Sequence, residues 1–110
     1  MKHVLWISRH TMTDDQISDL ERALNDVAQI HQWPMIVGNV HELDWAVKQA
    51  DAICAVLPVE KLSELLEIAG NRPVLVSKAK WERINGSPEI KFVHDGWYQM
   101  IRIVVEQKRV

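Results

Sequence analysis

The sequence has few of the residues that build disulfides and thiolate metal sites. Its 110 residues contain one cysteine, Cys54. A single cysteine excludes an internal disulfide and any site that needs several thiolates, as structural zinc sites usually do. Cys54 lies within the apolar run Ala52–Leu57, so we predict an inert thiol in the hydrophobic core.

Long apolar runs and an excess of positive charge are also missing. No stretch approaches the roughly 20 apolar residues that a membrane span needs, and no basic and apolar leader opens the sequence. We therefore expect a cytoplasmic protein with no membrane partner. The formal net charge of -2 provides no general field that would attract nucleic acid, so duplex DNA is not an expected partner.

Several signatures of common enzymes are absent. The sequence has no Gly-x-Gly-x-x-Gly, no Gly-x-x-x-x-Gly-Lys-Ser/Thr and no Gly-x-Ser-x-Gly, which argues against standard dehydrogenases, nucleoside triphosphatases and serine hydrolases. His3, His31 and His41 lack the spacing of metal ligands. We expect neither a metal site nor a cofactor.

The residues that are present predict one folded domain. At 110 residues the chain has a common single-domain size, and its 47% hydrophobic and 25% charged residues are ordinary for a globular protein. We expect a single domain over residues 1–110.

Strand and helix patterns alternate along the chain. Apolar runs bounded by turn residues predict strands at 3–8, 33–37, 52–57 and 73–77. The capping box Thr13-Asp14-Asp15-Gln16 starts a helix whose apolar stripe runs from Ile17 to His31, and further helical stripes cover 43–50 and 59–69. This order predicts an α/β fold, Rossmann-like, with a mainly parallel sheet and flanking helices.

The C-terminal part allows two interpretations. Residues 78–89 are polar and predict a loop or flap. Asp95-Gly96, the favoured pair for a type I′ turn, would then join strands at 90–94 and 97–106 into a C-terminal β-hairpin. The apolar residues of 97–105 also fit a helix, but the cluster Ile103-Val104-Val105 favours strands.

The best candidate site lies where strands end. Loops at the carboxyl ends of parallel strands converge, so the first loop, Ser8-Arg9-His10-Thr11, and Ser77-Lys78 after the fourth strand are expected to meet. Arg9 and Lys78 could neutralise a phosphate, and His10 could transfer a proton near neutral pH. The same loop could merely cap the helix. His94-Asp95 resembles a base with its carboxylate, but adjacent strand residues face opposite sides, so we interpret it as turn chemistry.

The opening Val4-Leu5-Trp6-Ile7-Ser8-Arg9-His10, with Thr13-Asp14-Asp15-Gln16, resembles the start of small CRISPR-associated proteins of the ring-nuclease group. The resemblance covers about the first quarter of the chain. It implies a homodimer that binds a cyclic oligoadenylate, a cyclic nucleotide messenger, and cleaves it without metal, lowering antiviral signalling. His10 and Arg9 would then be catalytic, and Ser8, Thr11, Ser77 and Lys78 would bind the ligand.

A second function stays open at this point. The same pocket would suit a non-catalytic nucleotide- or protein-binding domain from a mobile element or defence locus, so the sequence does not establish that the chain is an enzyme. A tryptophan patch around Trp81 and Trp97 would favour a protein partner, whereas a basic pocket of Arg9 and Lys78 would favour a nucleotide.

Overall fold

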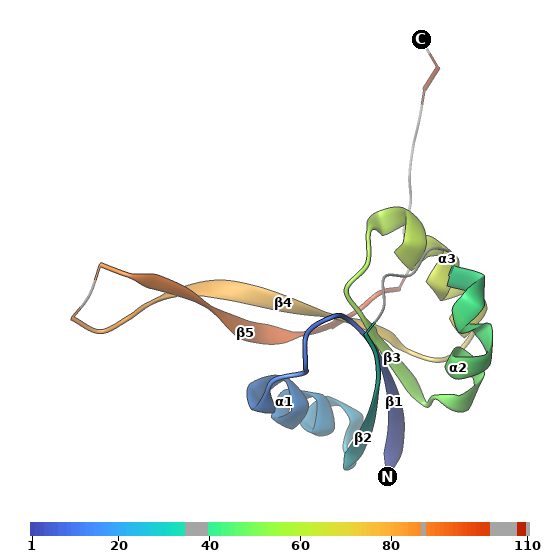
Figure 1. The fold of residues 1–110 in the computed structure, drawn as a ribbon, viewed down its shortest axis with the longest axis horizontal. Helices are drawn as coiled ribbons and strands as arrows, with labels where there is room; N and C mark the ends of the chain where they lie inside the picture. The colour runs from blue at the N-terminus through green and yellow to red at the C-terminus, as the bar shows by residue number, and fades with distance from the viewer. Residues whose placement is uncertain (35–39, 87, 102–107, 110) are drawn as a thin grey trace.

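A computed structural model describes residues 1–34, 40–86, 88–101 and 108–109. These residues confirm an α/β fold with a five-stranded sheet in the order β2-β1-β3-β4-β5, parallel except for the antiparallel pair β4–β5 (Figure 1). The elements are β1 (Lys2–Ile7), α1 (Asp14–Leu24), β2 (Ala28–Trp33), the 3₁₀ helix η1 (Val40–Leu43), α2 (Asp44–Gln49), β3 (Ala52–Ala55), α3 (Val59–Ala69), β4 (Val74–Arg83) and β5 (Ile90–Gln99).

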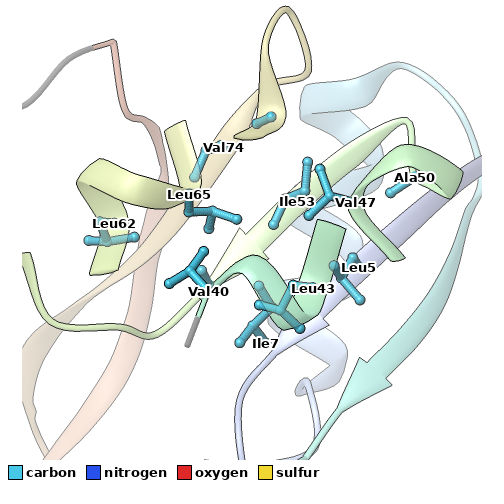
Figure 2. Packing of buried hydrophobic residues seen from close by; sticks show 12 residues of the cluster. Leu5, Ile7, Val40, Leu43, Val47, Ala50, Ile53, Leu62, Leu65 and Val74 are labelled. Carbon is cyan, nitrogen blue, oxygen red and sulfur yellow. The ribbon is translucent and has the colours of Figure 1, made fainter. Parts of the chain in front are cut away.

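Helices cover both faces of the parallel part of the sheet. Figure 1 shows α1 on one side and α2 and α3 on the other. Because neighbouring strand residues face opposite sides, β1 is buried on both: Val4 and Trp6 pack towards α1, while Leu5 and Ile7 pack towards the other helices. Figure 2 shows this second cluster, which includes Leu5, Ile7, Val40, Leu43, Val47, Ala50, Ile53, Leu62, Leu65 and Val74.

The first helix begins as the sequence predicts but ends earlier. The Thr13 side chain accepts from the Gln16 amide, and the Gln16 side chain accepts from the Thr13 amide, which confirms the capping box. The helix then ends at Leu24 because Asn25 takes the left-handed conformation (φ 55°, ψ 38°). The helical stripe predicted up to His31 is therefore wrong beyond this point.

Residues Ala28–Trp33 form β2, an edge strand parallel to β1. The alternation of Ala28 and Ile30 towards α1 with exposed Gln29 and His31 is the two-residue period of a half-buried strand. The strand expected at 33–37 thus lies earlier in the chain, and residues 35–37 fall outside the described residues.

The middle of the fold follows the predicted pattern. Strand β3 is central and its four residues are all buried, as expected for the apolar run at 52–57, although it ends at Ala55. Helix α3 ends at Gly70, whose φ of 61° favours glycine. Cys54 is buried, and this burial raises the pKa of its thiol. No helix among the described ranges is long and apolar enough to cross a membrane.

The C-terminal β-hairpin is confirmed, but its turn is elsewhere. Residues 78–83 continue β4 rather than forming a loop, and they pair with β5 as far as Arg83 with Ile90. The turn contains Asn85-Gly86, with Gly86 at a φ of 73°. Asp95-Gly96 lies inside β5, at a shift in the register of the ladder. An Asp-Gly pair fits such a bulge as well as a type I′ turn. The turn predicted at Asp95-Gly96 is therefore wrong. The hairpin projects beyond α1 as an arm (Figure 1).

Candidate functional site

The backbone of the loop after β1 is held by side chains. The Trp6 indole Nε1–H donates to the His10 carbonyl at 2.7 Å, and the Gln32 amide donates to the carbonyls of Ser8 and His10 at 3.0 and 3.1 Å. The Ser8 hydroxyl accepts from the His10 amide at 3.1 Å. These four bonds fix the path of residues 8–10.

The side chains of this loop divide into two kinds. Ser8 is buried, so its hydroxyl serves the loop itself. Arg9, His10 and Thr11 are exposed, and within the described part of the chain their side chains have no hydrogen-bond or ion-pair partner. A fixed backbone thus presents a guanidinium, an imidazole and a hydroxyl directly before α1.

The two predicted site residues in β4, Ser77 and Lys78, lie on opposite faces of the sheet. Ser77 lies beside the start of α1, where its hydroxyl accepts from the Gln16 amide Nε2 at 3.2 Å. Lys78 is exposed, with its ammonium Nζ 4.5 Å from the centre of the Tyr98 ring. Since neighbouring strand residues face opposite sides, Ser77 joins the α1 side of the sheet and Lys78 does not.

Ser77 is the end of a hydrogen-bonded row that sequence reasoning missed. The Ser77 Oγ lies 2.7 Å from His94 Nδ1, and His94 Nε2 lies 2.9 Å from Asp19 Oδ2. The Asp19 carboxylate can only accept, which assigns a proton to Nε2 of His94. In the tautomer that carries only this proton, Nδ1 accepts from the Ser77 hydroxyl, and the same hydroxyl accepts from Gln16. Every polar atom of the row is satisfied.

A β-bulge brings His94 into this row. The register shifts after Lys78, so that Ala79 lies opposite His94 and Asp95 becomes the extra residue of β5. The shift sets His94 on the same face as Ser77, with its side chain only 7% exposed. The interpretation of His94-Asp95 as turn chemistry is wrong, because both residues lie inside β5. The carboxylate partner of His94 is Asp19, 75 residues away, and the one signal in the sequence is the apolar context of residues 92–97, which indicates partial burial of His94.

Asp19 is held in its charged form. The hydrogen bond from His94 and those from the Arg22 guanidinium, at 2.9 and 2.6 Å, lower the pKa of the Asp19 carboxyl below its usual range. The carboxylate therefore fixes the tautomer and the orientation of the His94 ring.

Two indoles connect the row with the first loop. Trp97 donates from Nε1 to the Gln16 carbonyl at 2.8 Å, and its ring contacts both His94 and Trp6 at centroid distances of 5.5 and 5.9 Å. Trp6 in turn holds the His10 carbonyl. The loop and the row thus lie on the α1 side of the sheet and are linked through the contact of the Trp6 and Trp97 rings.

A cavity of about 440 Å³ lies elsewhere, along the first half of β1 on the side of α2. It contains the paired rings of His3 and His31, whose Nδ1 and Nε2 atoms are 3.2 Å apart. No predicted site residue lines it; its walls are His3, Leu5, His31, Gln32, Trp33, Trp45, Ala46, Gln49 and Ala50. Among the residues that the structure describes, no group of three or more His, Cys, Asp or Glu side chains could hold a metal ion.

Comparison with protein families, with curated proteins and with solved structures gives no match for this chain. The chemistry of the site therefore rests on its own residues: a fixed loop with Arg9, His10 and Thr11 exposed, and beside it the row Asp19–His94–Ser77.

Proposed function

We propose that this chain binds a cyclic oligoadenylate and cleaves it without a metal at the loop after β1, thereby switching off antiviral signalling. The observation that supports this most is the contrast within the loop. Its backbone is fixed by Trp6 and Gln32, while the side chains of Arg9 and His10 are exposed at the carboxyl edge of the sheet. Fixed geometry with unpaired functional groups is what positioning a reactive phosphodiester requires.

The proposed reaction uses only the ligand and the loop. The Arg9 guanidinium pairs with non-bridging oxygens of the phosphodiester, and His10 removes the proton of the adjacent ribose 2′-hydroxyl. That oxygen attacks the phosphorus, the bond to the 5′ oxygen breaks, and His10 returns the proton to the 5′ oxygen. The products are a linear chain with a 2′,3′-cyclic phosphate and a 5′-hydroxyl. The Thr11 hydroxyl lies on the same loop and helps to orient the ligand.

The test is incubation of the purified protein with cyclic tri-, tetra- and hexa-adenylate in chelator, followed by chromatography of the products. We expect linear products from the wild-type chain and at least about a 100-fold slower reaction for His10→Ala or Arg9→Ala. The matched control is His31→Ala, because His31 lies at the cavity on the α2 side of the sheet. Intact ligands with no bound fraction would rule the proposal out.

A second candidate function is binding of a protein partner through the arm, without chemistry. Trp81 and Phe92 pack on each other at a centroid distance of 3.6 Å, yet they are 65% and 61% exposed. A two-stranded ribbon with exposed aromatic rings is only marginally stable alone in water. Trp97, in contrast, is partly buried against α1 and does not belong to this patch.

The partner that we propose for the arm is a second copy of the chain. A two-fold arrangement that laid the arm of each copy along α1 of the other would place Arg83, near the tip of the arm, beside Asp14 and Asp15 in the first turn of α1. Sedimentation of wild-type protein and of Trp81→Lys tests this arrangement. We expect a dimer for the wild type and a monomer for the variant; a wild-type monomer at all concentrations would rule it out.

A further inference from the structure

We propose that Ser77 is a nucleophile that cleaves small, uncharged carboxylic esters, with His94 as its general base and Asp19 as the residue that positions His94. This activity is separate from the phosphodiester cleavage proposed above and does not depend on it. It rests on three hydrogen bonds, from Gln16 to Ser77, between Ser77 and His94, and between His94 and Asp19.

The geometry matches what activation of a serine requires. A serine hydroxyl is a weak nucleophile unless a base accepts its proton, and that base must be oriented by a third group. The distance of 2.7 Å between Ser77 Oγ and His94 Nδ1 is a short hydrogen bond, and Asp19 fixes the other ring nitrogen at 2.9 Å. Ser77 is half-buried and the His94 side chain is 7% exposed, so the base is shielded from water more than the serine is.

The surroundings of Ser77 favour an uncharged ester. Trp97 lies directly across the β4–β5 ladder from Ser77, and it packs in the apolar cluster beneath α1. Lys78 lies over Tyr98 and Arg22 is paired with Asp19, so neither of these cations is free to bind a charged ester at Ser77. The Gln16 amide donates to Ser77 through one N–H, and its second N–H has no partner among the described residues. That N–H is available to a developing negative charge.

The reaction proceeds in two balanced steps. The Ser77 O–H bond breaks, its proton moves to His94 Nδ1, and Oγ bonds to the ester carbon as the alcohol leaves with the proton from His94. Water then gives a proton to His94 and attacks the acyl carbon. The carboxylic acid is released as the bond to Oγ breaks, and Ser77 regains its proton. Asp19 stays ionised throughout and stabilises the transient imidazolium.

The first test is reaction of the native protein with diisopropyl fluorophosphate, in which the serine oxygen bonds to phosphorus and fluoride leaves. We expect one adduct, at Ser77, found by mass spectrometry of tryptic peptides. Ser63, on α3, falls in the same peptide and is the internal control. Protein unfolded in guanidinium chloride should not react. An absent adduct in the native protein, or one on Ser63 instead, would overturn the proposal.

Variants test whether the row Asp19–His94–Ser77 is catalytic or only structural. Hydrolysis of p-nitrophenyl acetate should fall to the background rate in Ser77→Ala, and labelling of Ser77 should slow about 100-fold or more in His94→Gln. Asp19→Asn should slow labelling as well, while circular dichroism shows that the fold is retained. Equal ester hydrolysis by wild type and Ser77→Ala would show that the row serves only to hold α1 against β5.

Discussion

His94 Nε2 lies 2.9 Å from Asp19 Oδ2, so a hydrogen bond joins β5 to α1 across 75 residues of sequence. The bond attaches the base of the arm to the first helix, beside the loop that carries Arg9 and His10. It also makes the stability of the chain depend on the charge of Asp19, because a protonated carboxyl no longer attracts Arg22 or holds His94 in the same way.

Replacing Asp19 by Asn should lower the free energy of unfolding by about 1–2 kcal/mol near neutral pH, since a charge-assisted hydrogen bond is lost. The folded-state pKa of Asp19 lies below its unfolded value, so its contribution is complete above about pH 4 and is lost as the pH falls through the folded pKa. Urea unfolding at several pH values should therefore show the two proteins converging in acid. The control is Glu64→Gln, at an exposed position of α3. A difference that does not change with pH would contradict this account.

Loss of the Thr13 cap should cost less stability than loss of Gln16, which belongs both to the capping box and to the hydrogen bonds around Ser77. Thr13→Ala removes one cap and should cost about 1 kcal/mol of stability. Gln16→Ala should cost more, because its side chain both completes the box and donates to Ser77. Thermal unfolding of the two variants, with the exposed Ser18→Ala as control, measures the order. A larger loss in Thr13→Ala would show that the bond to Ser77 contributes little.

The fold could be predicted where local pattern and burial agree. The apolar run of β3 and the Thr13–Gln16 box gave correct elements because each is decided by neighbouring residues. Prediction failed at Asn25, where a left-handed residue ends a helix whose apolar spacing continues to His31. A periodic pattern shows which side of a helix is apolar, but it does not show which residue adopts the backbone angles that end the helix.

The position of Ser77 in the sheet could be predicted more easily than its partners. Because β3 pairs in parallel with both β1 and β4, Ser77 lies at the level of the loop after β1, although β4 continues past it to Arg83. The row through His94 depends on the bulge at Asp95, which moves a strand residue to the other face. A sequence pattern cannot distinguish that bulge from a turn, so neither the face of His94 nor its distant partner Asp19 could be predicted.

Gln32→Leu should weaken the function of the first loop with little effect on the fold. Gln32 is exposed on the edge strand β2, and its amide holds the carbonyls of Ser8 and His10. Leucine keeps the size of the side chain and removes both donors. We expect a loss of unfolding free energy of about 1 kcal/mol or less, with a several-fold weaker affinity for cyclic oligoadenylate by calorimetry. The neighbouring Gln29→Leu, also exposed on β2, is the control. Equal affinities in all three proteins would show that the loop keeps its path without Gln32.

The thiol of Cys54 should react only when the protein opens. Cys54 is fully buried in β3, and burial raises the pKa of its thiol, so it carries almost no thiolate at neutral pH in the native state. We expect no reaction with 5,5′-dithiobis(2-nitrobenzoate) on the timescale of free cysteine, and full reaction of one thiol in guanidinium chloride. Leu65→Ala, which removes a buried side chain of the adjacent core cluster, should cost about 2–5 kcal/mol and accelerate the reaction by raising the population of open protein. Rapid modification of the native wild-type protein would contradict the burial of β3 between the two helical layers.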